Sequence, residues 1–104
     1  MKIGRAHVCE DVQYLDYEEP IPGPGEVKVK VRASGICGSD IPRVLHNGVH
    51  FYPIVLGHEF SGDVVEIGEG VTKVKVGDRV SGAPLKPCMK CDDCQNGNFS
   101  LCKH

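Results

Sequence analysis

Four cysteines stand within sixteen residues near the end of the chain, and they restrict its fold more than any other feature of the sequence. Their spacing is C-x2-C-x2-C-x7-C, formed by Cys88, Cys91, Cys94 and Cys102. Zinc takes four thiolates in a tetrahedral shell, and short C-x2-C spacings turn successive sulfur atoms toward one ion. The intervening residues are polar and turn-forming, as in a loop wrapped around a metal. Since four thiolates leave no open coordination position, a zinc ion at this site would be structural.

Three other interpretations of this loop, residues 87–102, make different demands on the sequence. A cubane iron–sulfur cluster shares the C-x2-C-x2-C spacing, but proline usually follows its fourth cysteine, and here Lys103 follows Cys102. A redox pair needs only one C-x2-C and leaves two thiols unexplained. A zinc ribbon for nucleic acid uses two separated cysteine pairs and usually a basic surface, and this sequence has neither feature. Spacing and context favour zinc, with an iron–sulfur cluster as the main alternative.

The composition argues against several classes of function. The formal net charge is −2, with Lys and Arg interspersed among Asp and Glu, so no basic surface for nucleic acid or an anionic membrane is predicted. The chain lacks the roughly 18 consecutive apolar residues of a membrane-spanning helix, and its N-terminus lacks the apolar segment of a secretory signal. We therefore expect a soluble, cytoplasmic protein with reduced thiols and neither a nucleic-acid nor a membrane partner.

Period-two alternation predicts mostly β structure in a single domain, residues 1–104. Val27, Val29 and Val31 alternate with charged residues, which indicates a half-buried strand. Further short strands, separated by glycine and proline turns, are predicted at residues 2–9, 12–17, 54–57 and 60–68. Many short strands with such turns favour an all-β barrel or sandwich.

Only one helix is predicted, a short one near residues 39–46 with Ser39 or Asp40 as its N-cap. No Gly-rich phosphate loop is recognisable. The sequence "GEG" at 68–70 lacks the third glycine and the βαβ context of a dinucleotide fingerprint. We therefore predict no nicotinamide-binding residues within this chain.

A second group of metal-capable residues lies upstream of the cysteine loop. The segment "GICGSD" places Cys37 in a glycine-flanked turn, and "LGHEF" contains His58 and Glu59. Three such protein ligands and one open position form the layout of a catalytic zinc site. From spacing alone, the alternative remains that Cys37 is a buried core thiol and His58 a hydrogen-bonded turn histidine.

The segment "GHEFSGDVVEIGEGV" resembles the signature of the zinc-containing alcohol dehydrogenases, with Gly62, Gly68 and Val71 at that family's spacing after Gly-His-Glu. The segments "GICGSD" and "VGDRV" and the four-cysteine loop occur in the family's order and at its separations. The chain is similar over essentially its whole length to the N-terminal part of a medium-chain, zinc-dependent dehydrogenase of the sorbitol, threonine and alcohol dehydrogenase group. Within this group, "CGSDIPRVLHNGVHFYPIVLGHEFSG" most resembles the galactitol-1-phosphate 5-dehydrogenases.

The resemblance implies a role for each residue of the upstream group. Cys37, His58 and Glu59 would bind a catalytic zinc ion, Glu59 either directly or through water. The remaining protein ligand would come from farther along the chain than this sequence extends. Ser39 matches the hydroxyl that passes on the substrate proton. Asp40 matches the carboxylate that hydrogen-bonds the zinc-binding histidine and fixes its tautomer.

The chain departs from the family pattern at Pro42, where many relatives carry a proton-relay histidine. Proline cannot titrate, so the proton would leave through His46 or through water. The alternative for both His46 and His50 is that they are ordinary surface residues. Arg43 is a candidate phosphate contact or, equally, a solvated surface arginine.

The implied chemistry is oxidation of an alcohol, polyol or polyol phosphate, or its reverse, with one catalytic and one structural zinc and NAD(P) as the hydride carrier. The implied fold is a GroES-like β-barrel, and the Rossmann domain that would bind the nicotinamide is absent from this chain. We therefore expect an N-terminal catalytic-domain fragment that is inactive alone, from a parent that forms a homo-oligomer. The alternatives are a stand-alone zinc-binding GroES-like module without catalysis and an iron–sulfur electron carrier.

Overall fold

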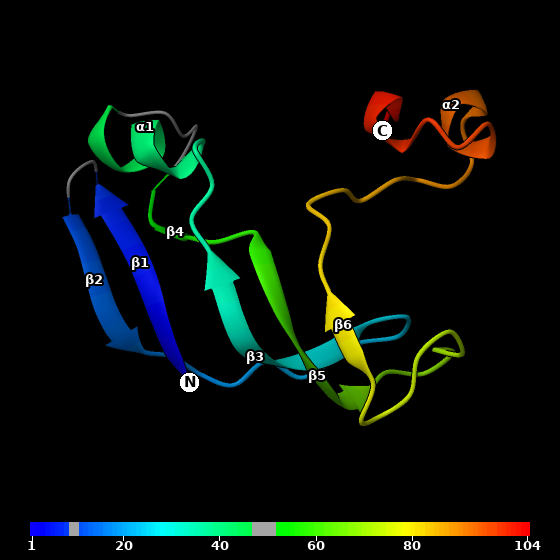
Figure 1. The fold of residues 1–104 in the computed structure, drawn as a ribbon, viewed down its shortest axis with the longest axis horizontal. Coiled ribbons are helices and arrows are strands. Elements are labelled where there is room, and N and C mark those ends of the chain that lie inside the picture. The colour runs from blue at the N-terminus through cyan, green and yellow to red at the C-terminus, as the bar shows by residue number, and fades with distance from the viewer. Residues whose placement is uncertain (9–10, 47–51) are drawn as a thin grey trace.

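A computed structural model describes residues 1–8, 11–46 and 52–104 of the chain. The described strands form two three-stranded antiparallel sheets (Figure 1). The first sheet has the order β2-β1-β4, formed by Asp11–Asp16, Lys2–Val8 and Ile54–Val55. The second has the order β3-β5-β6, formed by Val27–Gly35, Glu59–Ile67 and Arg79–Ser81. The predicted mainly-β fold class is therefore confirmed, and in the described part of the chain strand pairing stays within these two sheets without closing a barrel.

The sequence located the helices less completely than the strands. The predicted helix near residues 39–46 is α1, Asp40–Leu45, and Ser39 occupies its N-cap position without a capping hydrogen bond from its side chain. The prediction that it is the only helix is wrong, because α2 (Asp92–Gln95) and the 3-10 helix η1 (Phe99–Leu101) lie within the four-cysteine loop. Helices of three or four residues are too short to show a hydrophobic period, so the sequence pattern could not indicate them.

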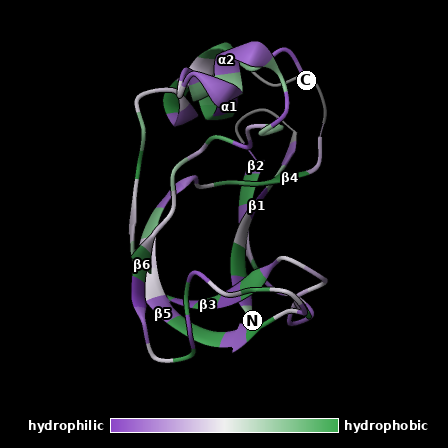
Figure 2. Cartoon of the chain, turned by 90° about the vertical axis from the view of Figure 1, so that its right-hand side faces the viewer, coloured by the Kyte–Doolittle hydropathy of each residue, from purple (hydrophilic) through white to green (hydrophobic). Residues whose placement is uncertain are grey.

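Little apolar surface is buried in the described residues. The buried apolar residues are Ile3 and Ala6 in β1, Val64 in β5 and Cys94 in α2. The predicted half-burial of β3 is only partly correct, since Val27 and Val31 are 37% and 54% exposed. These valines line an open groove of about 510 Å³ together with Met1 and Val65. Hydrophobic stretches occur in both sheets (Figure 2).

The second sheet carries the candidate site and is held together by the long antiparallel pairing of β3 with β5. Gly35 pairs with Glu59 at one end and Val27 with Ile67 at the other. A Cβ atom at Gly62 would clash with the backbone carbonyl of Lys30, so only glycine allows the two strands to approach this closely. Gly62, the last residue of the "GHEFSG" segment, therefore has a structural role, which is to allow close contact between the strands.

The four-cysteine loop lies apart from the sheets. An extended segment follows β6 and ends in a small lobe that contains α2, η1 and the C-terminus (Figure 1). Helix α1, in contrast, lies at the ends of the strands, beside the chain entering β4 (Figure 1). Two separate regions are thus available for metal binding.

No helix in the described part of the chain has the length and apolar character needed to cross a membrane.

Candidate metal centres

The sulfur atoms of the four-cysteine loop lie close enough together to share one ion. All four Sγ atoms lie within 4.8 Å of one another, and those of Cys88 and Cys94 are 3.9 Å apart. At Zn–S bonds of about 2.3 Å, the sulfur atoms of a tetrahedral shell stand roughly 3.8 Å apart. The described cysteines, which include all four of this loop, form no disulfide. The donor set therefore fits a single tetrahedral zinc ion.

The same distances weigh against the iron–sulfur alternative. A cubane cluster places four iron atoms and four sulfides between its cysteine ligands, so the cysteine sulfur atoms must stand farther apart than around one ion. A separation of 3.9 Å between Cys88 and Cys94 leaves no room for such a core. This discrimination depends on distances that the C-x2-C-x2-C spacing does not contain.

Backbone amides surround the sulfur atoms of this loop. Met89 adopts a left-handed conformation with φ of 62°, which is uncommon for a residue with a side chain. The following amides of Lys90 and Cys91 donate hydrogen bonds to Cys88 Sγ at 3.4 and 3.3 Å. The amide of Cys88 donates to Cys102 Sγ at 3.3 Å. Because thiolate is the ligand form of cysteine, this arrangement of donors favours metal binding.

The thiol pKa values of this loop diverge. Backbone hydrogen bonds, first from Lys103 and then from Cys94, lower the pKa of Cys91 to about 6. The backbone hydrogen bond from Cys88 likewise lowers the pKa of Cys102. Burial in α2 has the opposite effect and raises the pKa of Cys94 to about 12. Two thiols of the loop are thus predisposed to ionise, while the most buried one requires a cation beside it.

The upstream residues also converge, although they are distant in sequence. One ligand atom each from Cys37, His58 and Glu59 lies within 4.8 Å of the others. Cys37 lies in the turn between β3 and α1, while His58 and Glu59 lie where the chain enters β5. Cys37 and His58 are half-buried and Glu59 is exposed. The antiparallel pairing of β3 with β5 brings the two segments together at one end of the sheet.

The position of Glu59 depends on its neighbour across the strands. Gly35 is the direct partner of Glu59 in the β3–β5 pairing, and the Glu59 side chain lies over it. The sequence did not assign any role to Gly35. In the sequence it is distinguished only as the glycine two residues before Cys37, and its contact with Glu59 follows from strand register.

An open groove of about 660 Å³ exposes this second group of residues to solvent. Its lining includes Cys37, His58 and Glu59, together with Phe60 and Ser81. Ser39, the predicted proton-passing hydroxyl, is half-buried at the start of α1 and is not among the described residues that line this groove. The three candidate ligands therefore face a space that a small molecule can enter.

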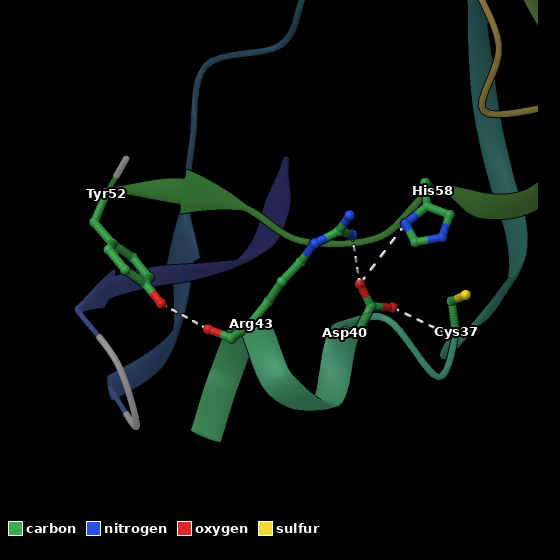
Figure 3. A network of polar contacts seen from close by, with 5 residues as sticks. All are labelled: Cys37, Asp40, Arg43, Tyr52 and His58. Carbon is green, nitrogen blue, oxygen red and sulfur yellow. Dashed lines mark hydrogen bonds and ion pairs between the residues drawn. The ribbon is translucent and has the colours of Figure 1, made fainter. Parts of the chain in front are cut away.

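Asp40, predicted to orient the histidine, is buried beside the group (Figure 3). Its Oδ2 accepts the backbone N–H of Cys37 at 3.0 Å, and its Oδ1 lies 3.7 Å from His58 Nδ1. Arg43 Nη1 lies 3.4 Å from the same Oδ1. The Nδ1 side of the His58 ring is therefore turned toward Asp40.

Arg43 and Tyr52 extend this network beyond the residues that the sequence indicated. Arg43 is half-buried and one of its guanidinium nitrogens pairs with Asp40, so a phosphate contact through its remaining donors stays a prediction. Tyr52 donates a hydrogen bond to the backbone carbonyl of Arg43 at 2.6 Å. The i,i+3 spacing of Asp40 and Arg43 could have indicated the first contact, but nothing local indicates the second.

The two histidines considered for proton transfer have different outcomes. His46 is exposed at the C-cap of α1, where its backbone N–H donates to the carbonyl of Pro42. No contact between its side chain and the candidate ligands is seen in the described residues, so its role stays a prediction. His50 lies outside the described residues.

Comparison with known proteins gives consistent matches. A family model described as the alcohol dehydrogenase GroES-like domain matches residues 23–104. Galactitol 1-phosphate 5-dehydrogenase of Escherichia coli strain K12 is 52% identical over 77 residues, covering 74% of this chain and 22% of that protein. Sorbitol dehydrogenase of Halalkalibacterium halodurans is 49% identical over 87 residues, covering 83% of this chain and 25% of that protein.

The fold comparison agrees with the sequence comparison. The crystal structure of galactitol-1-phosphate dehydrogenase from Escherichia coli matches with a TM-score of 0.94 at 43% identity. The match covers 100% of this chain and 30% of that one. The chain thus spans less than a third of the length of these relatives.

Proposed function

Because this chain belongs to the alcohol dehydrogenase GroES-like domain family, we propose that it is the metal-binding catalytic domain of a zinc-dependent, NAD(P)-linked dehydrogenase. The proposed substrates are polyols or polyol phosphates. This choice is supported by the similarity to a galactitol 1-phosphate 5-dehydrogenase and a sorbitol dehydrogenase. The observation that carries the proposal is the convergence of Cys37, His58 and Glu59 at an open groove.

The proposed work is divided between the two groups of residues. Cys37, His58 and Glu59 offer a thiolate, an imidazole and a carboxylate, which leaves a position of a tetrahedral shell for another ligand. Zinc bound there would supply Lewis-acid chemistry that lowers the pKa of a substrate hydroxyl. The loop with Cys88, Cys91, Cys94 and Cys102 offers a closed shell and would hold its zinc for structural reasons.

The surrounding residues have proposed roles of their own. Asp40 holds the turn that carries Cys37 by accepting a hydrogen bond from the Cys37 backbone N–H, and it faces Nδ1 of His58. Neutral imidazole donates through only one nitrogen, and a carboxylate on the Nδ1 side of the ring would favour the tautomer with Nε2 free for metal. Ser39 is proposed to pass on the substrate proton, as the family resemblance implies. From its present position at the start of α1, it would do so through water or after a small movement of the turn.

A chimeric enzyme tests this function directly. The corresponding N-terminal segment of the Escherichia coli galactitol 1-phosphate 5-dehydrogenase would be replaced with this chain, and reduction of NAD and NADP would be followed with galactitol 1-phosphate, sorbitol and ethanol. We expect turnover with the polyols, and loss of turnover in the Cys37→Ala and His58→Ala chimeras. The 104-residue chain alone is the control, for which no turnover is expected.

The non-catalytic alternative gives a different result. A chimera that is folded, retains zinc in its four-cysteine loop and still oxidises no alcohol would indicate a structural zinc-binding module. Turnover that survives the loss of both Cys37 and His58 would also contradict the proposal. Much better oxidation of ethanol than of the polyols would refute the substrate class but not the domain function.

A further inference from the structure

The carboxylate of Asp40 is the point where three groups of the site meet (Figure 3). Its Oδ2 accepts the amide of Cys37, while its Oδ1 faces both Arg43 Nη1 at 3.4 Å and His58 Nδ1 at 3.7 Å. The Asp40 side chain is only 10% exposed. The orientation of two candidate ligands therefore depends on how this single carboxylate is held.

A buried carboxylate requires compensation for the water it loses. Transfer of an ionised carboxylate out of water is costly unless the charge is paired and hydrogen-bonded. Among the residues that the structure describes, Arg43 is the permanently charged group placed against Asp40. Arginine stays protonated under all ordinary conditions, so this pairing persists whether or not His58 is charged.

Arg43 is itself held from the other side. Its backbone carbonyl lies in the last turn of α1, where carbonyl groups have no partner within the helix. The hydroxyl of Tyr52 donates to this carbonyl at 2.6 Å. Tyr52 precedes β4, so the contact joins the end of α1 to the segment that leads into the first sheet. Arg43 is thus held at two points, at its backbone carbonyl by Tyr52 and at its guanidinium group by Asp40.

We propose that Arg43 is a positioning residue of the candidate catalytic metal centre. It acts through Asp40: by occupying one side of Oδ1 it fixes the carboxylate, which in turn orients the Cys37 turn and the ring of His58. Tyr52 supports this role by fixing the helix end that carries Arg43. The inference rests on the proposed function, because it assumes that Cys37, His58 and Glu59 hold a metal.

Metal affinity of the 104-residue chain tests the proposal without any measurement of activity. Cobalt would be titrated into the metal-free chain and its Arg43→Gln, Arg43→Lys and Tyr52→Phe variants, with chelator competition to measure affinity and visible absorption to report ligand geometry. The four-cysteine loop serves as an internal reference in each sample. Arg32→Gln is the matched control, since Arg32 pairs with Asp63 at 2.8 Å in the same sheet but away from this centre.

We expect Arg43→Gln to weaken the upstream site about tenfold, the lower end of the effect usual for groups that orient metal ligands. Its absorption bands should shift, because the ligand geometry changes. Arg43→Lys should recover much of the affinity, Tyr52→Phe should lie between the wild type and Arg43→Gln, and Arg32→Gln should be unchanged. The reference site should keep its affinity in all five proteins.

Each opposing result has a distinct meaning. Arg43→Gln affinity within twofold of the wild type, with an unchanged spectrum, would overturn the positioning role and leave the proposed function intact. Absence of any second cobalt site in the wild type would overturn both. If the chimeric enzyme carrying Arg43→Gln showed only a raised KM for galactitol 1-phosphate and normal metal affinity, Arg43 would be a phosphate contact instead.

Discussion

Glu59 of β5 lies directly opposite Gly35 of β3, and its carboxylate occupies the space where a side chain at position 35 would begin. A Cβ atom on Gly35 would stand 2.5 Å from Glu59 Oε2 and 3.3 Å from Glu59 Cβ. A side chain at residue 35 would therefore require the carboxylate to move from its position beside Cys37 and His58. Strand register and the absence of one methyl group together place the third candidate ligand.

The first prediction concerns this contact. Gly35→Ala should displace the Glu59 carboxylate and lower the cobalt affinity of the upstream site about tenfold. The four-cysteine loop should keep its metal. Gly38→Ala is the matched control, since a Cβ atom there meets nothing within 4 Å and Gly38 lies in the turn that follows β3. Equal weakening by both substitutions in a chelator competition would show that the effect comes from turn flexibility rather than from Glu59.

The second prediction concerns the structural site. Cys91→Ser should release the zinc of the loop, because a hydroxyl is a poor substitute for a thiolate, and residues 87–102 should lose their order. Elemental analysis should show about one zinc fewer per chain, and hydrogen exchange should increase in this segment. Cys37→Ser is the reciprocal variant and should leave the loop protected. Iron with charge-transfer absorption in the wild type would disprove the zinc assignment.

The third prediction concerns the order of metal loss. The upstream site has three protein ligands and opens onto a groove, whereas the loop surrounds its ion with four thiolates. A chelator should therefore remove the upstream metal first, and the loop metal only at a much higher concentration. The two steps can be followed by cobalt absorption, since thiolate-rich and mixed-ligand sites differ in spectrum. A single step would indicate that the sites are coupled or that only one of them binds metal.

The fourth prediction concerns pH and the ion pair between Glu19 and Lys28, whose charged atoms are 2.8 Å apart. The hydrogen bond and charge of Lys28 lower the pKa of Glu19, and the hydrogen bond of Glu19 raises the pKa of Lys28. The pair therefore stabilises the fold between the ordinary pKa values of the two groups. Its contribution is lost as pH falls through the lowered pKa of Glu19 or rises through the raised pKa of Lys28.

The measurement is the Tm of the wild type and of Glu19→Gln at several pH values. The variant should melt slightly lower at neutral pH, and the two curves should meet in strong acid, where Glu19 is protonated in both folded and unfolded chains. The difference should also shrink at high salt, because exposed charges are screened. A difference that persists in strong acid would mean that the carboxylate stabilises the chain by something other than its charge.

The fifth prediction concerns the small core. Val64 is 1% exposed in β5, so Val64→Ala should lower the free energy of unfolding by about 2–3 kcal/mol through lost apolar burial and the cavity that remains. Val76→Ala is the control, because Val76 is 58% exposed, and its effect should stay within about 0.5 kcal/mol. Urea denaturation of the metal-loaded proteins measures both. Similar losses at the two positions would show that Val64 is not part of a well-packed core.

Local patterns in the sequence predicted most of the strands, helix α1 and the four-cysteine metal loop. Alternation of valine with charged residues was sufficient to place β3, because a strand is encoded by its own residues. The C-x2-C-x2-C spacing predicted a metal loop for the same reason, since three of its ligands lie within seven residues. The short helices α2 and η1 were not predicted, because helices of three or four residues are too short to show a hydrophobic period.

The tertiary structure decided what the upstream residues can do together. Helix α1 and strand β4 lie between Cys37 and His58 in the sequence. Spacing alone therefore left the alternative that Cys37 is an ordinary core thiol. Antiparallel register places them at one end of the sheet, sets Glu59 over Gly35 and leaves Arg43 against Asp40. These contacts depend on which strand pairs with which and at what offset. That information resides in the packing of distant segments, and no local sequence pattern carries it.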